Sequence, residues 1–79
     1  MSGDKRKTST FGEAVRKART EANLTQEELA DRSGLDRSYI GGVERGERNP
    51  TLCVIEKIAE GLGVTLAELF SYSASGPTA

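Results

Sequence analysis

Residues 26–45 read QEELADRSGLDRSYIGGVER and decide the fold expected of this 79-residue chain. Apolar residues recur at helical spacing on both sides of Gly34. They are Leu29, Ala30, Leu35, Ile40 and Val43. Ala30 is small enough to let two helices cross closely, and Gly34 can adopt the positive φ that ends a helix in a sharp turn. The stretch therefore predicts two short helices packed across a tight turn.

Helix caps around this stretch predict five helices in all. A threonine followed three residues later by a glutamate can form a reciprocal capping box at a helix start. Three such pairs occur, at Thr10 and Glu13, Thr25 and Glu28, and Thr65 and Glu68. Asp36 and Thr51 provide single caps for the third and fourth helices. The predicted helices end near Asn23, Ser33, Arg45, Gly61 and Phe70, and the fold class is all-α.

The large apolar residues of these helices form the predicted core. They are Phe11, Val15, Leu24, Leu29, Leu35, Ile40, Val43, Leu52, Ile55, Ile58, Leu62, Val64, Leu66, Leu69 and Phe70. Residues 1–9 and 71–79 lack apolar periodicity. We therefore expect one domain at residues 10–70, preceded by a flexible basic arm and followed by a flexible tail.

Composition argues against several classes of function. The chain has no histidine, and its single cysteine, Cys53, lies on a predicted helix without a neighbouring base. We therefore expect no metal, no cofactor, no small-molecule ligand and no enzymatic activity. No apolar run is long enough to span a bilayer, and none near Met1 resembles a signal peptide. These features predict a cytoplasmic protein with no membrane partner.

Charge is distributed unevenly along the chain. Residues 1–19 carry six Lys or Arg against two acids, whereas residues 49–79 carry one Lys against three acids. Phosphate attraction acts over about 8 Å at physiological salt, so a chain with a net charge of −1 can still present a basic face. Two interpretations of Lys5, Arg6 and Lys7 stay open: a solvated tail, or an arm that contacts DNA.

The capping, turn and core residues together resemble the phage-repressor-type helix-turn-helix domains of the Cro and Xre family, over residues 11–70. Within that range, the segment LDRSYIGGVERGERNP at residues 35–50 is similar to the controller proteins of bacterial restriction-modification systems. The resemblance implies a compact, five-helix, lambda-repressor-like DNA-binding domain, with its helix-turn-helix at the second and third helices. It also implies a homodimer that binds a palindromic operator in double-stranded DNA and regulates transcription.

The predicted recognition helix, residues 36–45, would lie in the major groove with its first turn nearest the bases. Arg37 can donate two parallel hydrogen bonds to O6 and N7 of guanine, which makes it the best candidate for direct readout. Ser38 matches a position that contacts bases in phage repressors. Gly42 is the third predicted base contact, on the interpretation that Gly41 and Gly42 let the helix backbone approach the groove. The alternative is that these glycines only avoid clashes with the second helix.

Phosphate contacts are predicted on both sides of the recognition helix. Gln26 resembles the family glutamine that anchors a phosphate at a helix N-terminus. Tyr39 can pack apolar surface or reach a phosphate with its hydroxyl, and packing is favoured. The full predicted set is Thr25, Gln26, Tyr39, Arg45, Arg48 and Asn49, with Thr25 primarily a helix cap and Arg48 also a candidate for a base contact.

The resemblance implies two further roles for charged residues. Arg19 and Glu44 correspond to positions that form a partly buried ion pair in phage repressors, so we expect that pair here. Glu27 and Asp31 lie on the second helix, from which a phage repressor offers acids to RNA polymerase. Two interpretations of these acids stay open: an activation patch, or a solvated helix face.

One small domain makes few DNA contacts, so a twofold homodimer is expected. The predicted interface residues are Val54, Leu66, Leu69 and Phe70, although the intramolecular core is the favoured place for Leu69. The function predicted by these residues is sequence-specific regulation of transcription, as a restriction-modification controller or a related small repressor or activator. The alternative is a protein-binding adaptor or antitoxin that uses the same fold.

Overall fold

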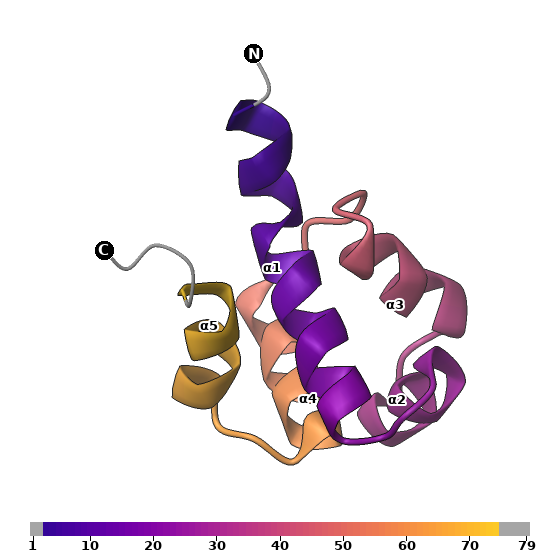
Figure 1. Ribbon diagram of the computed structural model, residues 1–79. Coiled ribbons are helices and arrows are strands. Elements are labelled where there is room, and N and C mark those ends of the chain that lie inside the picture. Colours follow the sequence, from indigo (N-terminus) through magenta and orange to yellow (C-terminus); the bar gives the residue numbers. More distant parts are fainter. Residues whose placement is uncertain (1–2, 75–79) are drawn as a thin grey trace.

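The computed structural model describes residues 3–74, with side chains described for residues 11–72. Five helices make up this part of the chain, which contains no strand: α1 (Gly3–Glu21), α2 (Gln26–Ser33), α3 (Arg37–Glu44), α4 (Leu52–Leu62) and α5 (Leu66–Ala74). The predicted all-α class and the helix-turn-helix at α2 and α3 are confirmed. In Figure 1, α1 runs through the middle of the molecule, with α5 on one side and α3 on the other.

Local sequence sets most helix ends. At α2, the backbone N–H of Glu28 donates to the Thr25 hydroxyl at 3.0 Å and the Glu28 carboxylate accepts from the Thr25 N–H at 2.9 Å. Thr65 and Glu68 form the same reciprocal box at α5, and Thr51 caps α4. The turn between α2 and α3 contains Gly34 at φ 70°, as predicted.

The first and last helices are longer than predicted. α1 begins at Gly3, so the start expected at Thr10 was wrong, and residues 3–9 form helix where an arm was expected. Lys5, Arg6 and Lys7 are good helix formers, and extending an existing helix is much easier than nucleating one. α5 continues to Ala74, four residues beyond the predicted end at Phe70.

The core lies where α1, α2, α3, α4 and α5 meet. Its largest fully buried side chains are Leu29, Ile40, Ile58, Leu69, Val15 and Val43. The prediction that Leu52 belongs to the core was wrong, because this first residue of α4 has a side chain that is 61% exposed. Phe70 is 42% exposed, although its ring contacts that of Phe11. A helical apolar pattern marks a face, but burial also requires a neighbouring element that covers that turn.

Two helical glycines permit close helix contacts that the sequence pattern did not reveal. A Cβ placed on Gly12 of α1 would collide with the backbone carbonyls of Val43 and Glu44 at the end of α3. A Cβ placed on Gly61 of α4 would collide with the hydroxyl of Ser33 on α2. Gly12 therefore lets α1 and α3 approach closely, and Gly61 does the same for α4 and α2.

Candidate nucleic-acid interface

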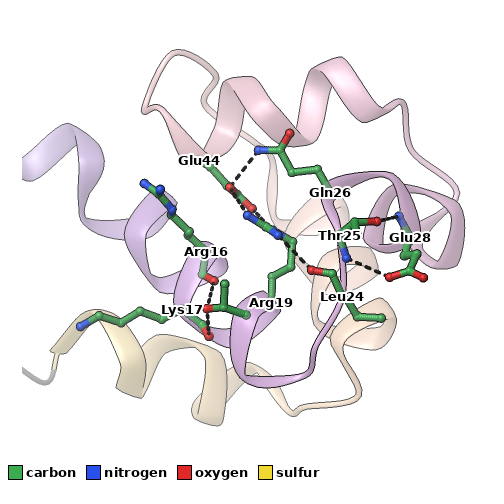
Figure 2. A network of polar contacts seen from close by, with 9 residues as sticks. Arg16, Lys17, Arg19, Leu24, Thr25, Gln26, Glu28 and Glu44 are labelled. Atoms are coloured by element: carbon green, nitrogen blue, oxygen red, sulfur yellow. Dashed lines mark hydrogen bonds and ion pairs between the residues drawn. The ribbon is translucent and has the colours of Figure 1, made fainter.

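A partly buried network ties α3, the predicted recognition helix, to α1 and α2. The Arg19 guanidinium donates to the Glu44 carboxylate through Nε at 2.6 Å and through Nη2 at 3.0 Å. The Gln26 amide donates to the same carboxylate at 3.0 Å, and Arg19 also donates to the Leu24 carbonyl at 2.9 Å. Figure 2 shows the bonds from Arg19 and Gln26 converging on Glu44, and the bond from Arg19 to Leu24 beside them.

The predicted Arg19–Glu44 ion pair is therefore present, with side chains only 13% and 5% exposed. Gln26, predicted as a phosphate anchor, lies in the first turn of α2 with its amide bound to Glu44. Its second N–H can still donate outward. Thr25 is a helix cap, as favoured from the sequence.

The first turn of α3 exposes the predicted base-reading residues. Arg37 and Ser38 are exposed, and no ion pair of the described residues involves Arg37. The Asp36 carboxylate accepts hydrogen bonds from both the backbone N–H and the hydroxyl of Ser38. The hydroxyl bond, together with that backbone bond, lowers the pKa of Asp36 below its usual value. These bonds tie the first turn of α3 to its cap residue.

The loop after α3 carries the remaining predicted cations. Arg45 and Glu47 form a two-bond ion pair, with Nε and Nη2 each 3.0 Å from a carboxylate oxygen. This pair lowers the pKa of Glu47 and raises that of Arg45. Arg48 and Asn49 are exposed in the same loop. The pairing of Glu47 with Arg45 was not predicted, because loop geometry decides whether residues two apart can meet.

Arg48 lies back over α3. Its guanidinium carbon is 5.9 Å from the centre of the Tyr39 ring, and its aliphatic stem covers Gly42. Gly42, predicted as a base contact, is therefore buried. Gly41 lies next to the side chains of Arg45 and Gln26. The alternative interpretation was that both glycines avoid clashes with the second helix. It fits Gly41, which lies near Gln26 of α2, better than Gly42, whose nearest neighbour is Arg48.

The predicted activation and dimer residues lie elsewhere. Glu27 and Asp31 are exposed and line an open hollow of about 430 Å³ between α2 and the start of α3. Val54 and Leu66 are half-buried, and Phe70 is exposed. Leu69 is fully buried in the core of the chain, so its inclusion in the predicted interface was wrong: its side chain has no surface left for a partner.

The described residues do not meet the requirements of a metal centre or of a membrane span. Within residues 3–74, no group of three or more His, Cys, Asp and Glu is placed to hold a metal ion. The helices in that range are also too short or too polar to cross a membrane.

Comparison with known proteins places this arrangement in a family. The helix-turn-helix family model matches residues 15–69. The control protein C.MunI from Mycoplasma sp is 48% identical over 62 residues, covering 77% of this chain and 84% of that protein. The crystal structure of the restriction-modification controller protein C.AhdI from Aeromonas hydrophila superposes with a TM-score of 0.78 at 52% identity, covering 81% of this chain and 97% of that one.

A further solved structure includes DNA. The restriction-modification controller protein C.Esp1396I, as a tetramer in complex with its natural 35 base-pair operator, superposes with a TM-score of 0.81 at 40% identity. The match covers 86% of this chain and 90% of that one. These relatives are regulators rather than enzymes.

Proposed function

Because the chain belongs to the helix-turn-helix family, and resembles its restriction-modification controllers over most of its length, we propose that it is a sequence-specific DNA-binding regulator of transcription. One observation carries the proposal: α3 is braced by buried contacts at its end while Arg37 and Ser38 are exposed on its first turn. A rigid helix with exposed polar side chains at one end suits the major groove.

Direct readout is assigned to the first turn of α3. Arg37 donates two hydrogen bonds to guanine, a geometry that no other base accepts equally well. The Ser38 hydroxyl donates to Asp36, which leaves its lone pairs to accept from a base N–H. This pattern favours a base that offers an amino group, cytosine or adenine, opposite Ser38.

Phosphate contacts surround this turn. The N-terminus of α2, with Thr25 and the second N–H of Gln26, attracts one phosphate, since helix N-termini favour anions. Arg45, Arg48 and Asn49 contact the backbone from the loop after α3. Tyr39 supports Arg48, and its hydroxyl can reach a phosphate from the same face.

A homodimer completes the binding unit. Val54, Leu66 and Phe70 are not fully covered by the chain's own helices, so they are the proposed contact with a second copy. Two copies related by a twofold axis would read the two halves of a palindromic operator about one helical turn apart. The operator complex of the C.Esp1396I tetramer supports assembly on DNA.

Glu27 and Asp31 are proposed as the contact to RNA polymerase. Both carboxylates are exposed beside the turn that would face DNA, where a basic surface of polymerase could meet them. Charge reversal at both positions should abolish activation while operator affinity is retained. Activation that persists after reversal would remove this assignment.

The central test is a gel shift with duplex DNA from upstream of the protein's own gene. Arg37→Ala should weaken binding by about 1–3 kcal/mol and relax sequence preference. Arg45→Ala should weaken all sequences alike and flatten the dependence on salt. Lys57→Ala, which removes an exposed cation from α4, is the matched control.

The result also separates regulation from the adaptor alternative. An adaptor or antitoxin with this fold would show no sequence-selective shift at low salt, and Arg37→Ala would change nothing. Enzymatic activity is not part of the proposal, since the relatives are regulators.

A further inference from the structure

The loop after α3 folds back so that Arg48 returns over the recognition helix. Gly46 has φ 79°, its N–H donates to the Val43 carbonyl at 3.0 Å, and the Glu47 N–H donates to the Gly42 carbonyl at 2.8 Å. This pair of bonds is the Schellman arrangement, which satisfies the last carbonyls of a helix and reverses the chain. The direction of Arg48 is thus set first by the backbone.

Two features of α3 then receive the Arg48 side chain. A Cβ built on Gly42 would lie 2.8 Å from Cγ of Arg48, 3.4 Å from Nε and 3.6 Å from Cδ. The arginine stem therefore occupies the space that a side chain at residue 42 would fill. Three residues earlier on the same helix face, the Tyr39 ring lies 5.9 Å from the guanidinium carbon, within cation–π range.

We propose that Gly42 is a positioning residue for Arg48: its missing side chain forms a notch that seats the arginine stem, and Tyr39 holds the guanidinium at the DNA-facing side of α3. This inference rests on the proposed DNA-binding function and changes the role expected of Gly42. Arg48 contacts the DNA, and Gly42 acts through it. Arg48 is exposed, so the seat orients the side chain without removing its charge from solvent.

If Gly42 forms this notch, the single methyl added by Gly42→Ala should preserve or raise the stability of the fold and lower its affinity for DNA. Gly42→Ala replaces a poor helix former with the best one, which favours α3. The added methyl meets only the Arg48 side chain closely, and that side chain is flexible and exposed. The fold can accept the methyl by moving Arg48, and the moved Arg48 no longer lies where DNA needs it.

The experiment is a double-mutant cycle on the full chain, with binding to upstream DNA measured by fluorescence anisotropy and melting followed by circular dichroism. Gly42→Ala should melt no lower than the unmodified protein and bind DNA about 5- to 30-fold more weakly, which corresponds to about 1–2 kcal/mol. In the Arg48→Ala background, Gly42→Ala should cause no further loss.

Gly41→Ala is the matched control, because it adds the same methyl one residue earlier, beside Arg45 and Gln26. Its effect on binding should be the same with or without Arg48. The Nε–H resonance of Arg48, recorded without DNA, should shift in Gly42→Ala and not in Gly41→Ala. That signal reports the seat independently of DNA binding.

Each remaining outcome contradicts the inference. An equal loss in the Arg48→Ala background would mean that Gly42 approaches DNA itself. Unchanged affinity would mean that Arg48 needs no seat, and a lower melting temperature would mean that Gly42 serves packing alone. If the unmodified protein fails to bind DNA, the proposed function is refuted and this inference falls with it.

Discussion

Two ion pairs of similar geometry lie in different surroundings among residues 11–72, and their comparison isolates the effect of burial. Glu44 accepts two bonds from Arg19 with its side chain only 5% exposed. Glu47 accepts two bonds from Arg45 with its side chain 59% exposed. Replacing Glu44 and Glu47 in turn by glutamine therefore makes the same chemical change in a buried pair and in an exposed pair.

Glu44→Gln should destabilise the fold strongly. The amide removes the negative charge that compensates Arg19, and its NH2 group, whichever oxygen position it takes, faces an N–H donor of Arg19. Breaking a buried ion pair costs about 3–5 kcal/mol, and we expect the lower end because Arg19 retains its bond to the Leu24 carbonyl. In a domain of this size, about 3 kcal/mol corresponds to a fall of roughly 12–24 °C in melting temperature.

The assay is urea and thermal unfolding followed by circular dichroism at neutral pH and at two salt concentrations. Glu47→Gln should leave the melting temperature nearly unchanged, because an exposed ion pair is screened by solvent. Similar losses in the two variants, or a Glu44→Gln protein that melts with the unmodified chain, would refute the reasoning.

Three further predictions concern packing and titration. The Ser33 hydroxyl is buried without a hydrogen-bond partner, so Ser33→Ala should not destabilise the protein in urea unfolding. Gly61→Ala alone should destabilise it by about 1–3 kcal/mol, because the added methyl would collide with that hydroxyl. Adding Ser33→Ala to Gly61→Ala should therefore recover part of the loss. Leu52→Ala should change the unfolding midpoint little, because the side chain is 61% exposed, and a large loss would show that it is covered in solution. The pKa of Glu47, followed by carbon NMR, should lie below its ordinary value and rise in Arg45→Ala; its small stabilising contribution is present at neutral pH and is lost as pH falls through that lowered pKa.

The sequence alone determined the starts of α2 to α5 and the turn between α2 and α3, because those depend on residues within one helical turn of each other. Thr25 with Glu28, Thr65 with Glu68, and the positive φ of Gly34 are all local features, and the structure contains each of them. The start of α1 was mispredicted for a related reason. A capping pair marks where a helix can begin, yet it does not stop a helix that started earlier.

Tertiary structure decided which side chains are covered and which charges meet. Leu52 and Leu69 both follow the apolar pattern of their helices, but only Leu69 has another helix over it. The notch at Gly42 is filled by Arg48, six residues later, only because the loop reverses at Gly46. Burial and long-range contacts depend on the relative placement of whole helices, and the spacing of residues within one helix does not specify that placement.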